Sequence, residues 1–138
     1  MDEFENWDDV FEEISEEESE IIRKLSGNYY AKPTVYVSKE HFYWNRKAGE
    51  SVIQNNRSIR IEISKNYIYF TLYEKPNMYG TFAVWKNSSK DDDTDCYVSS
   101  FPSHLREFSV KPGLRLIYKC KDKKNKFAIK RDELYTEG

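Results

Sequence analysis

The chain has 138 residues, enough for one hydrophobic core of ordinary domain size with a short appended segment. Its 22 aromatic residues favour strands, and its 5 Gly and 4 Pro argue against a low-complexity protein. The chain begins without a basic segment or an apolar run, so we expect neither a signal peptide nor a membrane span and place the protein in the cytoplasm, in a bacterial host cell.

The charge divides the chain into two predicted parts, an acidic arm at 1–27 and a basic β-rich domain at 28–138. Residues 1–20 carry 11 acidic side chains and no basic one, whereas residues 21–138 carry 22 Lys and Arg against 13 Asp and Glu, a net +9. Such asymmetry suggests a connection with nucleic acid, by binding it or by resembling it. A solvated acidic tail is the alternative.

The arm is predicted to form an acidic amphipathic helix, or two helices that divide near Ser15. Steps of three and four separate its apolar side chains, with Glu18 in the same series, so they share one stripe of a helix. We expect this stripe to pack on the body, on a second copy or in a partner's groove. The stripe consists of Phe4, Trp7, Phe11, Ile14, Ile21 and Leu25. The outer face presents Asp8, Asp9, Glu12, Glu13, Glu16, Glu17 and Glu20, a row of carboxylates that resembles a phosphate backbone.

Residues 34–74 predict a unit of strand, short helix, strand, turn and strand. The unit begins at Tyr-Val-Ser (36–38), continues through a helical stretch at 45–53 and a turn at 54–57, and ends in strands at 58–64 and 67–74. In "SIRIEIS" isoleucines alternate with Arg60 and Glu62, which indicates one core face and one solvent face.

An extra strand is predicted at 80–86, followed by the acidic loop "NSSKDDDTD" at 87–95. This loop lacks the Gly and Glu that an EF-hand places at fixed distances from the first Asp, so it indicates a solvated tip and not a cation site.

A second unit is predicted at 95–133, again with Tyr-Val-Ser (97–99), a helical stretch at 102–110, a turn at Lys-Pro-Gly (111–113) and a hairpin. Along its strand "LRLIYKCK", where Ile117 breaks the alternation, Leu114, Leu116, Tyr118 and Cys120 are assigned to the core and Arg115, Lys119 and Lys121 to solvent-facing or edge positions. The shared order of elements indicates a pseudo-repeat, with chance similarity as the alternative.

The segment "YVSSFPSHLREFSVKPGLRLIYKCKDKKNKFAIKR" (97–131), and loosely residues 36–73, resembles the swapped-hairpin unit of AbrB and MazE-like proteins. The first copy has Asn55, Asn56 and Arg57 where the family has Gly. The resemblance implies a β-barrel, which two identical chains build in that family and two halves of one chain would build here, and it implies DNA binding through basic surface residues. The fold class expected is therefore α+β, mainly β, with an antiparallel β-barrel-like core and the N-terminal acidic helix.

Catalytic signatures are absent from the sequence. It contains no phosphate-binding loop, no G-x-G-x-x-G and no G-x-S-x-G, and its histidines, His41 and His104, stand apart from any metal-ligand motif. Cys96 and Cys120 form no C-x-x-C pair, which favours reduced, partly buried thiols over a disulfide. We expect a non-enzymatic binding protein without cofactor or metal.

Two binding functions compete, and they use different surfaces. The first hypothesis is an inhibitor of phage or mobile-element type, directed against host nucleic-acid machinery such as CRISPR or restriction enzymes, with the acidic helix as a DNA mimic. The alternative is an AbrB-like DNA-binding regulator, whose basic residues would be Arg57, Arg60, Lys119, Lys121, Lys123, Lys124, Lys126, Lys130 and Arg131. Tyr29, Tyr30, Tyr43 and Trp44 are candidates for base stacking, although core positions suit them better. The stripe also permits a protein that dimerises, so a monomer and a homodimer are both open.

Overall fold

The computed structural model describes residues 24–25, 32–88, 95–103 and 108–136. These residues form mainly strands. In chain order the elements are β1 (Thr34–Val37), β2 (His41–Trp44), α2 (Arg46–Ala48), the π-helical turn η1 (Gly49–Ile53), β3 (Ser58–Ile63), β4 (Tyr67–Tyr73), β5 (Phe82–Ser88), β6 (Asp95–Ser100), β7 (Gly113–Leu116), β8 (Tyr118–Lys119) and β9 (Lys126–Lys130).

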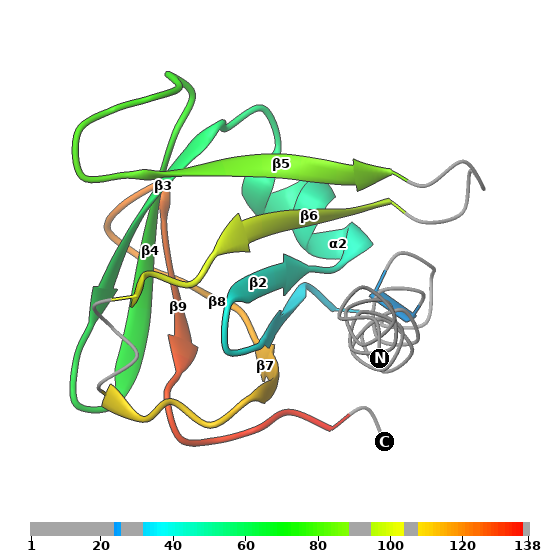
Figure 1. Cartoon of the computed structure of the whole chain (residues 1–138), viewed down its shortest axis with the longest axis vertical. Coiled ribbons are helices and arrows are strands. Elements are labelled where there is room, and N and C mark those ends of the chain that lie inside the picture. Colours follow the sequence, from blue (N-terminus) through cyan, green and yellow to red (C-terminus); the bar gives the residue numbers. More distant parts are fainter. Residues whose placement is uncertain (1–23, 26–31, 89–94, 104–107, 137–138) are drawn as a thin grey trace, which may run out of the picture.

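Within the described residues, nine strands form one antiparallel sheet in the order β7-β1-β2-β6-β5-β3-β4-β9-β8. In Figure 1, strands β2, β5 and β6 run roughly horizontally, whereas β3, β4 and β9 run roughly vertically. The sheet therefore curves into two halves. Strand β5 joins them, because it pairs with β3 at Phe82 and Ala83 and with β6 from Val84 onward. The expected antiparallel, barrel-like core is confirmed.

The barrel nearly closes at the two outermost strands, β7 and β8, which only Ile117 separates. Leu116 of β7 pairs with Thr34 of β1, whereas Tyr118 of β8 pairs with Ala128 of β9. One bent strand thus serves both edges in turn, which reduces the unpaired backbone that an open sheet would expose. The interruption predicted at Ile117 is where the strand changes partner.

Arg115 holds this closure together. It lies on β7, an outermost strand, which agrees with the predicted edge position, whereas the solvent-facing position is wrong. The side chain is fully buried, and its guanidinium donates to the carbonyl oxygens of Gly113 (3.0 Å), Lys130 (3.3 Å) and Arg131 (2.7 Å). Burial lowers the pKa of Arg115, and the negative charge of Asp132 opposes this shift. The guanidinium therefore ties β7 to the end of β9 across the seam.

Alternating apolar side chains fill the barrel, as the pattern of "SIRIEIS" indicated. Ile59 and Ile61 of β3 are buried, and β4 and β9 contribute their own alternating sets. The centre is aromatic: the ring of Phe70 lies edge-on to Phe42 and Trp44, with centroids 5.2 and 4.9 Å away. The Trp44 indole N–H donates to the Ser99 hydroxyl at 3.1 Å, which satisfies its one buried donor.

A short helical stretch follows β2, as predicted. The side chain of Asn45 caps α2 by accepting from the Ala48 N–H at 2.8 Å, and it also accepts from the Thr34 N–H at 3.1 Å. Gly49 then begins η1, and a Cβ on it would lie 2.7 Å from the ring of Tyr97 on β6. The glycine allows the helical turn to approach the sheet closely.

The predicted pseudo-repeat remains a prediction. Its two hairpins, β3–β4 and β8–β9, lie side by side through the pairing of β4 with β9. The first unit, however, contains a further strand, β2, which the predicted order did not separate. Residues 104–107, the centre of the second predicted helical stretch, lie outside the described residues.

Of the predicted arm, the structure describes Lys24 and Leu25, which are helical. Leu25, the last member of the predicted stripe, is fully buried against Tyr43, Cys96 and Val98 on the outer side of the sheet. The stripe therefore meets the body of its own chain at this residue.

No helix among the described residues is long and apolar enough to cross a membrane.

Replacing Arg115 tests the closure. We expect Arg115→Met to lower the free energy of unfolding by about 2–4 kcal/mol, because three partly buried carbonyl oxygens lose their donor, and Arg115→Lys to cost less, because an ammonium still donates. Urea unfolding followed by circular dichroism measures the change. Arg57→Met is the control, an exposed arginine for which we expect a change within about 0.5 kcal/mol. Equal effects of the two methionine variants would contradict the proposed role.

Candidate nucleic-acid interface

The outer side of β3, β4, β9 and β8 is rich in tyrosine and cations. Because Ile59, Ile68, Phe70, Leu72 and Ile129 point into the core, the alternate residues of these strands point outward. We call this outer surface the tyrosine-lysine face. It consists of Arg60, Glu62, Tyr67, Tyr69, Thr71, Tyr73, Tyr118, Lys126, Ala128 and Lys130.

The register aligns these side chains in rows across the strands. Thr71 of β4 pairs with Arg60 on one side and with Lys126 on the other, so two cations flank it in one row. The next row runs Glu62, Tyr69, Ala128, Tyr118, and the last pairs Tyr67 with Lys130. The pairing of β4 with β9 therefore brings the basic residues of two distant sequence segments onto one surface.

Each cation on the face lies over a tyrosine ring. The Lys126 ammonium is 4.9 Å from the ring centroid of Tyr69, and the Lys130 ammonium is 5.6 Å from that of Tyr118. Arg60 lies similarly over Tyr73, at 5.7 Å. Such contacts hold the cations in place without neutralising them.

Positive charge exceeds negative charge on this face. Glu62 is the one carboxylate among its outward side chains, against Arg60, Lys126 and Lys130. Just beyond β9, Glu133 lies 3.1 Å from the Lys130 ammonium and raises its pKa through a hydrogen bond and its negative charge. Lys130 is exposed enough for solvent to screen this ion pair, so the pair is exchangeable.

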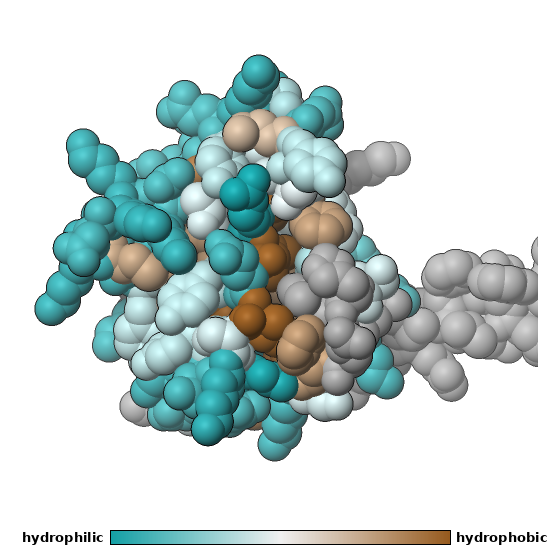
Figure 2. All heavy atoms as spheres, turned by 90° about the vertical axis from the view of Figure 1, so that its left-hand side faces the viewer, coloured by the Kyte–Doolittle hydropathy of each residue, from teal (hydrophilic) through white to brown (hydrophobic). Residues whose placement is uncertain are grey.

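Figure 2 views the molecule from the side on which β3 and β4 lie in Figure 1. Hydrophilic and intermediate residues cover most of the coloured surface, around a hydrophobic strip in the middle.

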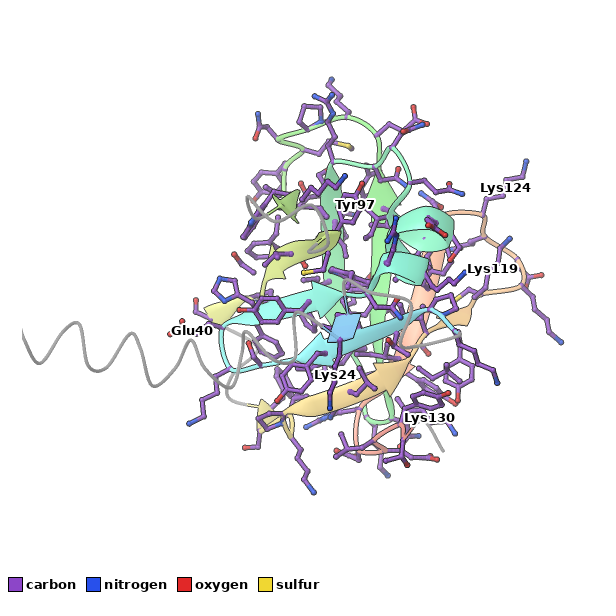
Figure 3. All side chains as sticks on the ribbon, turned by 90° about the vertical axis from the view of Figure 1, so that its right-hand side faces the viewer. Lys24, Glu40, Tyr97, Lys119, Lys124 and Lys130 are labelled. Atoms are coloured by element: carbon purple, nitrogen blue, oxygen red, sulfur yellow. The ribbon has the colours of Figure 1, made fainter. Side chains whose placement is uncertain are left out.

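The other predicted basic residues fall into three groups. Lys119, at the end of β8, and Lys121, Lys123 and Lys124, in the turn before β9, are exposed. Figure 3 shows Lys119 and Lys124 projecting outward near this hairpin. Arg57 is exposed immediately before β3.

Arg131 is placed differently, because its guanidinium is used inside the protein. It donates to the carbonyl oxygen of Ser64 at 3.2 Å and to that of Phe108, and it stacks over the Phe108 ring at 5.5 Å. Its Nε is buried without a hydrogen-bond partner. Arg131 therefore fastens the end of β9 to the β3–β4 turn and is poorly placed to contact phosphate.

The predicted acidic surface lies outside the described residues, since it consists of Asp8, Asp9, Glu12, Glu13, Glu16, Glu17 and Glu20. Residues 89–94 of the predicted acidic loop are also outside them. Within the described residues no three His, Cys, Asp or Glu side chains are grouped to hold a metal ion. Cys96 is buried and Cys120 half-buried, and they form no disulfide.

Two of the four stacking candidates named from the sequence lie in the core. Tyr43 and Trp44 are buried, as their alternative core assignment predicted, and Tyr29 and Tyr30 lie outside the described residues. Tyr118, expected in the core, is instead 41% exposed. The alternation in "YIYFTLY" (67–73) is the signal that could have identified the exposed ones, because its tyrosines occupy alternate positions opposite Ile68, Phe70 and Leu72.

A hollow of about 640 Å³ lies between η1 and the β5–β6 pair. Its described lining includes Arg46, Glu50, Gln54, Lys86 and Tyr97. Glu50 forms a 3.8 Å ion pair with Arg46, so part of its charge is compensated locally. The groups present suit a polar ligand and do not include a paired nucleophile and base.

The substitution Arg131→Gln tests whether Arg131 stabilises the fold or is available to bind phosphate. We expect it to lower the free energy of unfolding by about 1–2 kcal/mol, because two carbonyl oxygens lose a charged donor. Lys124→Gln, at an exposed turn position, should change it by no more than about 0.5 kcal/mol. Thermal and urea unfolding provide the comparison, and equal stability of the two variants would count against the structural role.

Comparison with known proteins adds no assignment. No family model matches the chain, and neither a curated protein nor a solved structure matches it significantly.

Proposed function

We propose that the chain binds nucleic acid through the tyrosine-lysine face and the adjoining β8–β9 turn. The observation that carries the proposal is the arrangement of Arg60, Lys126 and Lys130 on one sheet surface, each beside an exposed or half-exposed tyrosine. The exposed lysines of the turn, Lys121, Lys123 and Lys124, extend this positive charge beyond the edge of the sheet, and Lys119 is exposed at the end of β8.

Counterion release supplies the driving force for such an interface. Each cation that meets a phosphate releases condensed counterions, so affinity falls as the salt concentration rises. Lys126 and Arg60 have no carboxylate in their aligned row, whereas Lys130 must exchange Glu133 for a phosphate oxygen. We therefore expect Lys126 and Arg60 to contribute more than Lys130.

The inhibitor function predicted from the acidic arm is a second proposal. The one described observation that favours an ordered arm is the burial of Leu25, which fixes the end of the predicted stripe on the body. In this proposal the carboxylates of residues 8–20 occupy the cationic groove of a nucleic-acid-processing enzyme, and no membrane is involved.

Neutralising the face tests nucleic-acid binding. We expect the combined change Arg60→Gln, Lys126→Gln and Lys130→Gln to reduce the slope of log affinity against log salt by about 2 for single strands and about 3 for duplex DNA. Fluorescence anisotropy with the full-length chain at several salt concentrations gives the slope. The control is Lys39→Gln, an exposed lysine in the turn between β1 and β2. The proposal would be overturned if the salt slope of the wild type is near zero. It would also be overturned if Lys39→Gln reduces the slope as much per removed charge as the triple variant does.

Neutralising the arm tests the inhibitor function separately. With Glu12, Glu13, Glu16 and Glu17 all changed to Gln, we expect the chain to bind nucleic acid more tightly at low salt, because less negative charge repels phosphate. The same variant should lose any inhibition of a DNA-cleaving enzyme that the wild type produces. Retained inhibition would exclude the arm as a DNA mimic.

A further inference from the structure

We propose that the ligand of the tyrosine-lysine face is a single-stranded nucleic acid, whose bases stack on Tyr67, Tyr69, Tyr73 and Tyr118. This inference rests on the proposed nucleic-acid binding and adds the strandedness of the ligand and the means of contact. The inference is based on the four tyrosines, whereas the proposed nucleic-acid binding is based on the basic residues.

The rings are accessible at the surface of the sheet. Tyr67 is 36% exposed and Tyr118 41% exposed, while Tyr69 and Tyr73 are half-buried beside them. The four tyrosines gather on the outer surface of adjacent strands, and each offers a π-face to any base. Base–aromatic stacking is the contact by which proteins hold single strands without reading their sequence.

The spacing of the rings suits successive unstacked bases. Outward residues on one strand are about 6.6 Å apart, and neighbouring strands are about 4.8 Å apart. Tyr67 and Tyr69 are consecutive outward residues of β4, with ring centroids 5.9 Å apart and planes tilted by 38°. Tyr118 continues the row of Tyr69 two strands away, beyond Ala128. The rings thus lie at separate positions and do not form one stack.

Two of the rings carry a lysine that could contact a phosphate once a base has stacked on the ring. Lys126 lies over Tyr69 and Lys130 over Tyr118. A base that stacks on either ring displaces the ammonium from it, and the flexible lysine stem lets the charge move to the adjacent phosphate. Each ring and its lysine therefore form a unit that meets one base and one phosphate.

A duplex fits this arrangement poorly. Its bases are paired and stacked, so they offer no free face to a tyrosine, and its major groove admits a helix or a two-stranded ribbon. The tyrosine-lysine face is the outer surface of four paired strands, β3, β4, β9 and β8, which is too broad to enter a groove. Binding to a duplex would engage its phosphates and leave the tyrosines without a role.

The decisive comparison uses two strands that differ only in their bases. Fluorescence anisotropy at fixed salt measures the affinity of the full-length chain for oligothymidine of about 16 nucleotides, an abasic strand of the same length and a duplex of the same length. We expect wild type to bind oligothymidine at least about tenfold more tightly than the abasic strand, because each stacked base adds affinity. Oligouridine in the same assay shows whether RNA is bound equally.

Variants then assign the effect to the rings. Tyr69→Ala and Tyr118→Ala should each weaken binding of oligothymidine by about 5- to 100-fold and leave the abasic strand nearly unchanged, while the matching Phe variants keep wild-type affinity. Trp85→Ala is the control, because Trp85 of β5 is an aromatic of equal exposure (42%) outside this face, and it should change neither affinity. Thermal unfolding verifies that every variant is folded.

The outcomes separate the two proposals. Equal binding of thymidine and abasic strands, or tighter binding of the duplex, overturns the single-strand inference and leaves nucleic-acid binding in place. Failure to bind any of the probes overturns both. If in that case the mass of the chain rises with concentration and Tyr118→Ala prevents the rise, the face is an interface between copies of this chain.

Discussion

The closure of the sheet by one bent strand is the constraint on which the rest of the molecule depends. Because β7 pairs with β1 and β8 with β9, with only Ile117 between them, the two edges of the sheet are held close together. Arg115 stabilises this seam by donating to carbonyl oxygens on both sides of it. A buried guanidinium is costly unless its donors are satisfied, and here each of its three nitrogen atoms donates to a carbonyl oxygen.

The same closure produces the tyrosine-lysine face. Once β8 has paired with β9, and β9 with β4, the two hairpins present a continuous outer surface. Arg60 then shares a row with Lys126, although 66 positions separate them along the chain. The positive charge of this face and the negative charge of the arm belong to different parts of the chain. They cancel in the sum, so the net charge of the whole chain is only −2.

The strands were largely predictable because local alternation reports burial. The pattern of "SIRIEIS" identified β3, the run at 67–74 identified β4, and the extra strand at 80–86 is β5, shifted by two residues. The same reasoning failed at the seam, where Arg115 is buried and Tyr118 exposed. There the strand bends and changes its pairing partner. Alternation along a single flat strand therefore no longer predicts which side chains face the core and which face solvent.

What the sequence determined by itself was the mainly β composition, the helical stretch after β2 and the separation of charge, because each follows from residues close together in the chain. The candidate site required the tertiary structure. Basic residues are distinguishable in the sequence, yet nothing local indicates that Arg131 is used internally while Lys126 is not, or that tyrosines of β4 and β8 share a surface. Those facts depend on which strands pair and in which register, and long-range pairing is decided by the packing of the whole core.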